Sequence, residues 1–180
     1  MKIIINEDNL KNDEVNEFSS KVRCILINQN NQILVCNYGG TYLLPGGKID
    51  GREDNIDALI RELNEETGVL YNRNDFNPFC ELQYFQKDYP KRDSEIKINR
   101  LVTTFYYLGT YKEINLDKQI LSDKEIKSNF KLELIDINEL ESIILNNHNS
   151  NPRNIYFQKE LLMIFNKFKN TKENVFVPKK

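Results

Sequence analysis

The segment from Asp54 to Thr67 limits what this chain can fold into more than any other part of the sequence. Its apolar residues stand at i, i+3, i+4 and i+7, the spacing that places side chains on one face of a helix. They are Ile56, Leu59, Ile60 and Leu63. Asp54 is a suitable N-cap, and Gly68 stands where a glycine commonly ends a helix. The pattern therefore predicts an amphipathic helix with one face buried in a core.

Short apolar stretches on both sides of this helix predict β-strands. They cover residues 22–28, 32–38, 79–86, 96–111 and 131–136. The first two are joined by an Asn-rich turn and are predicted to form a hairpin, and the next two are predicted to form a longer antiparallel hairpin. The chain has 180 residues, which is the usual length of a single domain.

The two ends of the chain are predicted to flank this domain. Residues 1–20 are polar and are interpreted as an irregular arm, residues 21–170 as the domain, and residues 171–180 as a loose tail. A short helix is predicted near residues 138–145, and a terminal helix follows the break at 147–153. The apolar stripe predicted for that helix consists of Ile155, Leu161, Leu162, Ile164, Phe165 and Phe168.

Composition excludes several classes of protein. Hydrophobic residues make up 39% of the chain and charged residues 29%, which argues for a folded core and against disorder. Because no apolar run approaches the roughly 18 residues of a membrane span, and the N-terminal sequence turns acidic early, we expect neither a membrane protein nor a secreted one. A net charge of −2 argues against duplex DNA as the main partner. The three widely spaced cysteines, Cys24, Cys36 and Cys80, indicate reduced thiols and a cytoplasmic location.

A second pattern overlaps the predicted helix. Pro45-Gly46-Gly47 allows a sharp turn with no side chain in the way of a ligand. Five residues separate Gly47 from Glu53, and seven residues separate Glu53 from the run Arg61-Glu62-Leu63-Asn64-Glu65-Glu66-Thr67-Gly68-Val69. This stretch of 23 residues resembles the signature box of the Nudix hydrolases and matches every fixed position of it.

The resemblance implies both a fold and an activity. Nudix proteins are α/β proteins in which a mixed β-sheet lies between helices, an α/β/α sandwich. They hydrolyse the pyrophosphate bond of a nucleoside diphosphate linked to another group, so a nucleotide or nucleotide derivative is the expected substrate. The box does not distinguish a nucleoside triphosphate, a nucleotide sugar or the 5′ end of an RNA. The sequence is also compatible with either a monomer or a homo-oligomer.

Three glutamates of the box share one face of the predicted helix. Glu62, Glu65 and Glu66 stand at i, i+3 and i+4. Like charges at this spacing repel by roughly a few tenths of a kcal/mol on an exposed helix, and a bound cation would relieve the repulsion. Ligands that are all oxygen favour Mg²⁺, or Mn²⁺ in its place, over zinc. Such an ion can orient a diphosphate and lower the pKa of a bound water.

The roles of single residues follow from the resemblance. The implied metal ligands are Glu62, Glu65, Glu66 and the backbone carbonyl of Gly46. The catalytic candidates are Glu62, Glu65 and Arg61. Glu62 is favoured as the proton acceptor, although different family members use different carboxylates for this role. Arg61 precedes the acids and is predicted to pair with Glu53 or Glu65 and to orient it.

Other interpretations compete with catalysis. The acids could form only a solvated helix face, which is the usual role of a charge run. A Nudix-like domain could also sense nucleotides without hydrolysing them, or the enzyme could act on RNA 5′ ends. A domain that does not catalyse would be free to lose box residues, and this chain has lost none.

The remaining polar and aromatic residues have simpler structural interpretations. The basic residues in the stretch 87–100 could face phosphate or RNA, but acidic neighbours favour a solvated hairpin tip. They are Lys87, Lys91, Arg92, Lys97 and Arg100. The tyrosines of the predicted strands could stack on a base, but they are more typical of half-buried strand positions. His148 lies in an Asn-rich loop and is predicted to be a surface residue.

Overall fold

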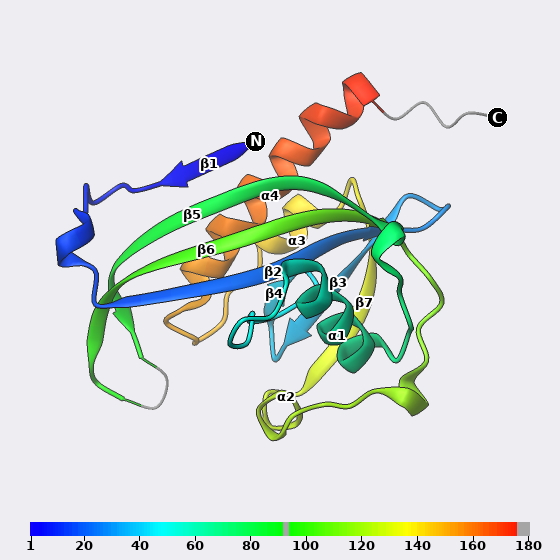
Figure 1. The fold of residues 1–180 in the computed structure, drawn as a ribbon, viewed down its shortest axis with the longest axis horizontal. Coiled ribbons are helices and arrows are strands. Elements are labelled where there is room, and N and C mark those ends of the chain that lie inside the picture. The colour runs from blue at the N-terminus through cyan, green and yellow to red at the C-terminus, as the bar shows by residue number, and fades with distance from the viewer. Residues whose placement is uncertain (92–93, 176–180) are drawn as a thin grey trace.

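A sheet covered by helices on both faces organises the molecule (Figure 1). The computed structural model describes residues 1–91 and 94–175. Its strands are β1 (Lys2–Ile5), β2 (Glu17–Ile27), β3 (Gln32–Tyr38), β4 (Thr41–Leu43), β5 (Phe76–Pro90), β6 (Lys97–Thr110) and β7 (Phe130–Asp136). Its α-helices are α1 (Asn55–Thr67), α2 (Asp123–Lys127), α3 (Leu140–Leu145) and α4 (Asn154–Val175). Short 3₁₀ turns are η1 (Asn12–Glu14), η2 (Arg73–Asp75) and η3 (Leu116–Lys118).

The described strands form one mixed sheet. Its order is β1-β5-β6-β2-β3-β4, and β7 pairs with β3 beside this path. β1 runs parallel to β5 and β2 runs parallel to β6, whereas the other pairs are antiparallel. The predicted long hairpin is β5 with β6, the two strands that curve together across Figure 1. The predicted α/β fold with a mixed sheet is therefore confirmed.

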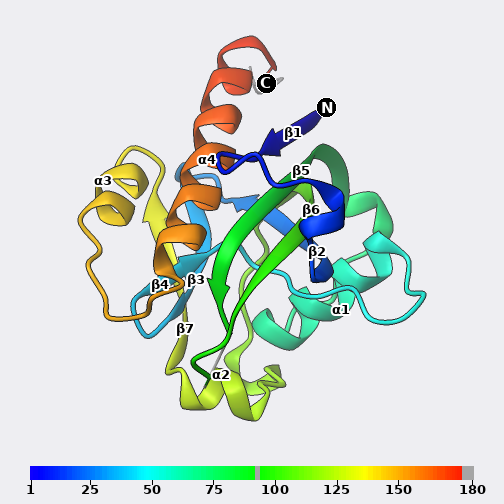
Figure 2. The same cartoon turned by 90° about the vertical axis from the view of Figure 1, so that its left-hand side faces the viewer.

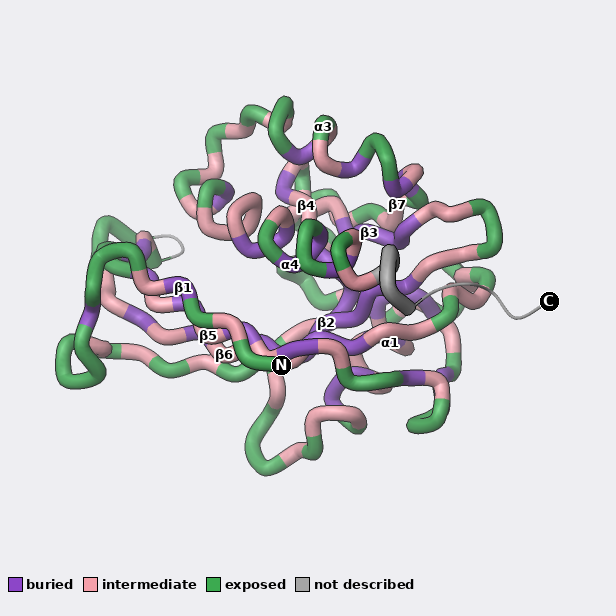
Figure 3. Tube along the Cα trace, turned by 90° about the horizontal axis from the view of Figure 1, so that it is seen from above, coloured by how far each residue is buried: buried purple, intermediate pink, exposed green. Residues whose placement is uncertain are grey.

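Two hydrophobic cores lie on opposite faces of this sheet. Helix α1 packs on one face, and α3 and α4 pack on the other (Figure 2). Because side chains alternate along a strand, β2 contributes to both cores: Cys24 belongs to the core that includes Leu59 of α1, and Ile25 to the core that includes Phe165 of α4. Figure 3 shows the buried segments gathered around β2 and β3. The predicted layering of helix, sheet and helix follows from this division.

Helix α1 forms as its sequence predicts. The Asp54 side chain accepts a hydrogen bond from the Ile56 backbone N–H at 2.9 Å, which caps the N-terminus. Gly68 ends the helix in the left-handed region at φ 68°, and a Cβ there would overlap the carbonyl oxygen of Asn115. Glycine is required at this position both by the backbone conformation and by the close approach of that carbonyl.

The predicted hairpin of residues 22–28 and 32–38 differs in its pairing. β2 and β3 are antiparallel, but Ile27 and Ile33 are their one Cα partner pair among the described residues. The long partner of β2 is β6, and the other edge of β2 is taken by the turn after β4. There Val22 N donates to Gly47 O at 3.0 Å and Cys24 N donates to Pro45 O at 2.9 Å. β2 and β3 separate because the chain that follows β4, residues 45–49, folds back onto β2.

The ends of the chain are more regular than the sequence suggests. The description of residues 1–20 as irregular is wrong, because β1 pairs with β5 and β2 already begins at Glu17. At the other end α4 continues to Val175, inside the predicted tail, and residues 176–180 lie outside the described part. Ile155 was predicted to belong to the apolar stripe of the terminal helix, and this is wrong, because it is 67% exposed. The domain limits at residues 21 and 170 stay a prediction.

Candidate active site

The Pro45-Gly46-Gly47 turn lies directly on strand β2. Gly46 has a φ of 123°, and a Cβ there would overlap the carbonyl oxygen of Val22. A side chain at Gly46 would therefore be disfavoured twice, by backbone strain and by contact with β2. The turn is held by the two backbone bonds to β2, and this places its peptide groups beside the last turn of α1.

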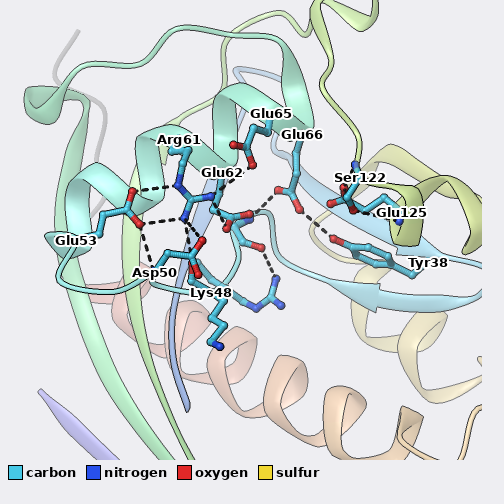
Figure 4. Close-up of polar contacts among 12 residues, drawn as sticks. Tyr38, Lys48, Asp50, Glu53, Arg61, Glu62, Glu65, Glu66, Ser122 and Glu125 are labelled. Carbon is cyan, nitrogen blue, oxygen red and sulfur yellow. Dashed lines mark hydrogen bonds and ion pairs between the residues drawn. The ribbon is translucent and has the colours of Figure 1, made fainter. Parts of the chain in front are cut away.

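Glu66 is the buried acid of the site (Figure 4). Only 1% of the residue is exposed, and each carboxylate oxygen accepts one hydrogen bond. The Gly46 backbone N–H donates to Oε2 at 2.7 Å, and the Tyr38 hydroxyl donates to Oε1 at 3.0 Å. Burial nevertheless raises the pKa of Glu66 to about 8, so these two neutral donors do not fully compensate the buried charge.

Arg61 connects the other acids of the box. Its guanidinium forms a bidentate pair with Glu53, with both N–O distances 3.0 Å. Its Nη1 also lies 2.9 Å from Glu62 Oε1 and 3.4 Å from Glu65 Oε2. Because these carboxylates hold it, the pKa of Arg61 is raised, first through Glu53. The sequence predicted that Arg61 pairs with Glu53 or Glu65, and in the structure it contacts both (Figure 4).

Glu62 lies between Arg61 and the glycine turn. A Cβ on Gly47 would overlap the Glu62 carboxylate, so the missing side chain makes room for this acid. Burial raises the pKa of Glu62, and the bond from Arg61 opposes that shift. The predicted site residues are therefore gathered around one end of α1: Arg61 holds Glu62 and Glu65, and Gly46 holds Glu66.

The donor chemistry of this region fits a hard divalent cation. Glu65 and Glu66 lie in the last turn of α1, which carries no basic residue, and the C-terminal end of a helix has a partial negative charge. Acids at that end are unfavourable unless a cation neutralises them. Within residues 1–91 and 94–175, however, no three His, Cys, Asp or Glu side chains are arranged to hold one ion. Arg61 and the Gly46 N–H occupy carboxylate oxygens, so side chains must rotate before three acids can bind one ion.

Three residues outside the box complete the site, and the sequence analysis missed their role. Tyr38 comes from the end of β3 and Arg23 from β2, where its Nη1 donates to the carbonyls of Leu44 and Gly46. The Gln119 side chain donates to the Glu66 backbone carbonyl at 2.5 Å. No spacing in the sequence signals these contacts, because each depends on the tertiary fold.

The polar stretch between β5 and β6 is only partly a solvated tip. Lys87, Lys91 and Lys97 are exposed, whereas Arg92 lies outside the described residues. Arg100 is buried: its Nε donates to Gln86 Oε1 at 2.5 Å, and its guanidinium carbon lies 3.3 Å from the centroid of the Tyr89 ring. Arg100 is therefore part of the sheet face and not of the tip.

Other residues lie where their simpler interpretations place them. Tyr84, Tyr89, Tyr106 and Tyr107 are buried in the strands and His148 is exposed. The three cysteines are free and buried. No helix in the described ranges is long and apolar enough to cross a membrane.

Comparison with known proteins identifies the family. The NUDIX domain model matches residues 18–158, which is most of the chain. The chain belongs to the Nudix family.

Individual relatives are more distant. A U8 snoRNA-decapping enzyme of Homalodisca vitripennis is 33% identical over 79 residues, which are 37% of this chain and 42% of that protein, so the chain matches less than half the length of this relative. An Ap4A hydrolase of C. elegans in a binary complex has a TM-score of 0.53 at 12% identity, over 87% of this chain and 99% of that one. A MutT protein of Methanosarcina mazei Go1 has a TM-score of 0.51 at 16% identity, over 87% and 96%. At these identities the two structures show a common fold.

Replacing Arg61 by lysine tests the orienting role of the guanidinium. Arg61→Lys keeps the charge but loses the fork that binds Glu53, so Glu62 and Glu65 lose a fixed partner. We expect metal affinity to fall by about 10-fold or more, together with a lower maximal rate. The measurement is a Mg²⁺ titration of both proteins. Full activity of Arg61→Lys at saturating metal would contradict the orienting role and show that Arg61 forms only an ordinary surface ion pair.

Proposed function

We propose that this protein is a Mg²⁺-dependent hydrolase of the pyrophosphate bond in a nucleoside diphosphate linked to another moiety. The observation that carries the proposal is the buried carboxylate of Glu66. This residue lies in the last turn of α1, the helix that also bears Glu62 and Glu65, and its carboxylate accepts the backbone N–H of Gly46. A solvated acidic face needs no buried carboxylate and no glycine turn packed on it. The complete box in a Nudix domain supports the same reaction class.

Each residue has a role in this proposal. Glu62, Glu65, Glu66 and the Gly46 carbonyl are the groups that would hold Mg²⁺, or Mn²⁺ in its place. When bound, the ion supplies charge neutralisation for the diphosphate and lowers the pKa of water. Glu62 accepts the proton of the attacking water, because its carboxylate lies at the turn and is oriented by Arg61. Arg61 holds the acids in place through its pair with Glu53.

Chelation tests whether the acidic face works with a metal. With a chelator present, hydrolysis of a nucleotide substrate should be abolished, and excess Mg²⁺ should restore it, because the carboxylates alone repel a diphosphate. Product chromatography after a long incubation gives the readout. Turnover that persists in chelator contradicts the metal site, and a nucleotide that binds but is recovered unchanged identifies a sensing domain.

An RNA 5′-end pyrophosphohydrolase is the second candidate function. Its support is the similarity to a protein named as a U8 snoRNA-decapping enzyme. A substrate panel with Mg²⁺ separates the candidates: a nucleoside triphosphate, a nucleotide sugar and a 5′-triphosphorylated or capped RNA. If RNA is the substrate and the stretch 87–100 touches it, its hydrolysis should fall steeply with salt and with charge reversal at the exposed Lys91.

The proposal also includes the cellular location of the protein and the limits of its catalytic domain. We place it in the cytoplasm, because the three cysteines are free thiols buried in the cores. Residues 21–170 are the proposed limits of the catalytic domain.

A further inference from the structure

Arg23 is a buried charged residue that lies outside the signature box. Only 6% of it is exposed, and it belongs to the central strand β2. Its Nη1 donates to two backbone carbonyls of the turn, those of Leu44 and Gly46, the latter at 3.2 Å. Gly46 also donates its backbone N–H to Glu66. Arg23 and Glu66 therefore bind the backbone of one residue, Gly46, at its carbonyl and at its N–H.

The surroundings of Arg23 keep it charged. Burial lowers the pKa of Arg23, but Glu160 of α4 and, more weakly, Glu66 raise it, and the net change is upward. Glu160 is fixed by the Tyr106 hydroxyl, which donates to Oε1 at 2.5 Å, and by Thr104 at 3.2 Å. A permanent cation thus stands between an acid on α4 and the acid on α1.

A contribution to fold stability does not explain why an arginine occupies position 23. Its Nε is buried and has no hydrogen-bond partner within the described residues, which is costly for a guanidinium. An apolar side chain of similar volume would fill the same space without that cost. What an apolar residue could not do is hold the two carbonyls of the turn.

We propose that Arg23 is a positioning residue for the divalent-metal site: by binding the Leu44 and Gly46 carbonyls, it fixes the backbone of Gly46 against Glu66. The inference rests on the proposed function. Without Arg23 the turn keeps its backbone bonds to β2 at Pro45 and Gly47 but loses the contact that fixes the residue between them, Gly46. The Gly46 carbonyl and the Glu66 carboxylate then no longer present their oxygens in one fixed arrangement.

The test is Mn²⁺ binding, measured by electron paramagnetic resonance of the free ion, in the full chain without substrate. We expect Arg23→Met, which keeps the apolar stem, to weaken Mn²⁺ binding about 10-fold or more, as loss of groups that orient metal ligands commonly does. Arg23→Lys keeps the charge but replaces the rigid guanidinium, whose Nη1 is fixed on both carbonyls, by an ammonium on a flexible stem, and it should weaken binding about 3-fold or more. If Arg23→Met does not fold, Arg23→Lys carries the test.

Lys21→Met is the matched control. Lys21 lies two residues earlier on the same face of β2 and near the same Glu160, and its ammonium is 5.8 Å from the centroid of the Phe157 ring rather than on the turn. Removing this cation should leave Mn²⁺ affinity at the parent value. An equal loss in Lys21→Met would mean that buried positive charge matters and not the contact with the turn, and the proposal fails.

The outcomes also separate this inference from the proposed function. If the parent hydrolyses nucleotides and folded Arg23→Met or Arg23→Lys binds Mn²⁺ as tightly as the parent, or more tightly, the positioning role is wrong while the function stands. If the parent binds Mn²⁺ but hydrolyses no member of the panel, and the Arg23 variants bind it weakly, the function fails while the positioning role holds.

Discussion

Glu66→Gln is expected to lower kcat by about three orders of magnitude, because the transition state loses several kcal/mol of metal-dependent stabilisation. The amide has the size of the carboxylate, and its oxygen can still accept the Gly46 N–H, so the turn stays in place. Steady-state rates at saturating Mg²⁺ give the measurement. Glu65→Gln is the control on the same face, and it should cost less, since the Glu65 side chain is 37% exposed and is held by Arg61 at the long distance of 3.4 Å.

The same substitution should change stability in a distinct way. Burial raises the pKa of Glu66 from 4.5 to about 8, so in metal-free protein the folded state holds a proton that the unfolded state releases. The stability that comes from this proton is complete below about pH 4.5 and is lost as the pH rises to about 8. We therefore expect the Tm of the parent in chelator to fall more between pH 5 and pH 8 than that of Glu66→Gln. Parallel pH profiles of the two proteins would contradict the burial of the charge.

Gly47→Ala should damage catalysis while leaving the fold intact. The new Cβ would overlap the Glu62 carboxylate, and a glutamate side chain can rotate away at small cost, so the protein folds but Glu62 leaves Arg61. Displacing a reacting group by about 1 Å commonly costs about 100-fold in rate, and we expect a loss of that size in kcat. Rate measurements, with the Tm as a check on folding, test this.

Gly51→Ala is the control for the glycine substitution. Gly51 lies in the loop between the turn and α1 at φ 55°, and a Cβ there meets nothing within 4 Å. Alanine in this left-handed conformation costs roughly 1–2 kcal/mol of stability. The expected result is a lower Tm with the parent kcat, the opposite of Gly47→Ala. A loss of kcat as large as that of Gly47→Ala would show that the loop, and not the position of Glu62, limits the rate.

The sequence predicts the parts of the site that depend on local spacing. Helix α1 is local: its apolar positions, its Asp54 cap and its Gly68 end are all readable within fifteen residues, and so is the common face of Glu62, Glu65 and Glu66. The environment of these acids is not local. Tyr38 is 28 residues from Glu66, and Arg23 is 23 residues from Gly46, so the burial of Glu66 and its two hydrogen bonds depend on how strands and turn pack.

Strand pairing shows the same limit. Residues 22–28 and 32–38 do form neighbouring antiparallel strands, but a pattern of apolar residues cannot tell which edge of a strand a later segment will occupy. Here residues 45–49 hydrogen-bond to β2 and displace most of the expected pairing. The strand β1 was missed because a four-residue edge strand carries too few residues to show a period.

The segment that follows β6 has a consequence for how the site opens. It crosses the C-terminal end of α1, where Asn115 N donates to Thr67 O at 2.8 Å, Ile120 N donates to Glu65 O at 2.9 Å, and Gln119 donates to Glu66 O. Helix ends normally fray, since their last carbonyls have no partner within the helix. Here those carbonyls are tied to residues 115–120, so the carboxylate-bearing turn can unwind only when that segment lifts. Lifting of residues 115–120 and fraying of the last turn of α1 are therefore coupled.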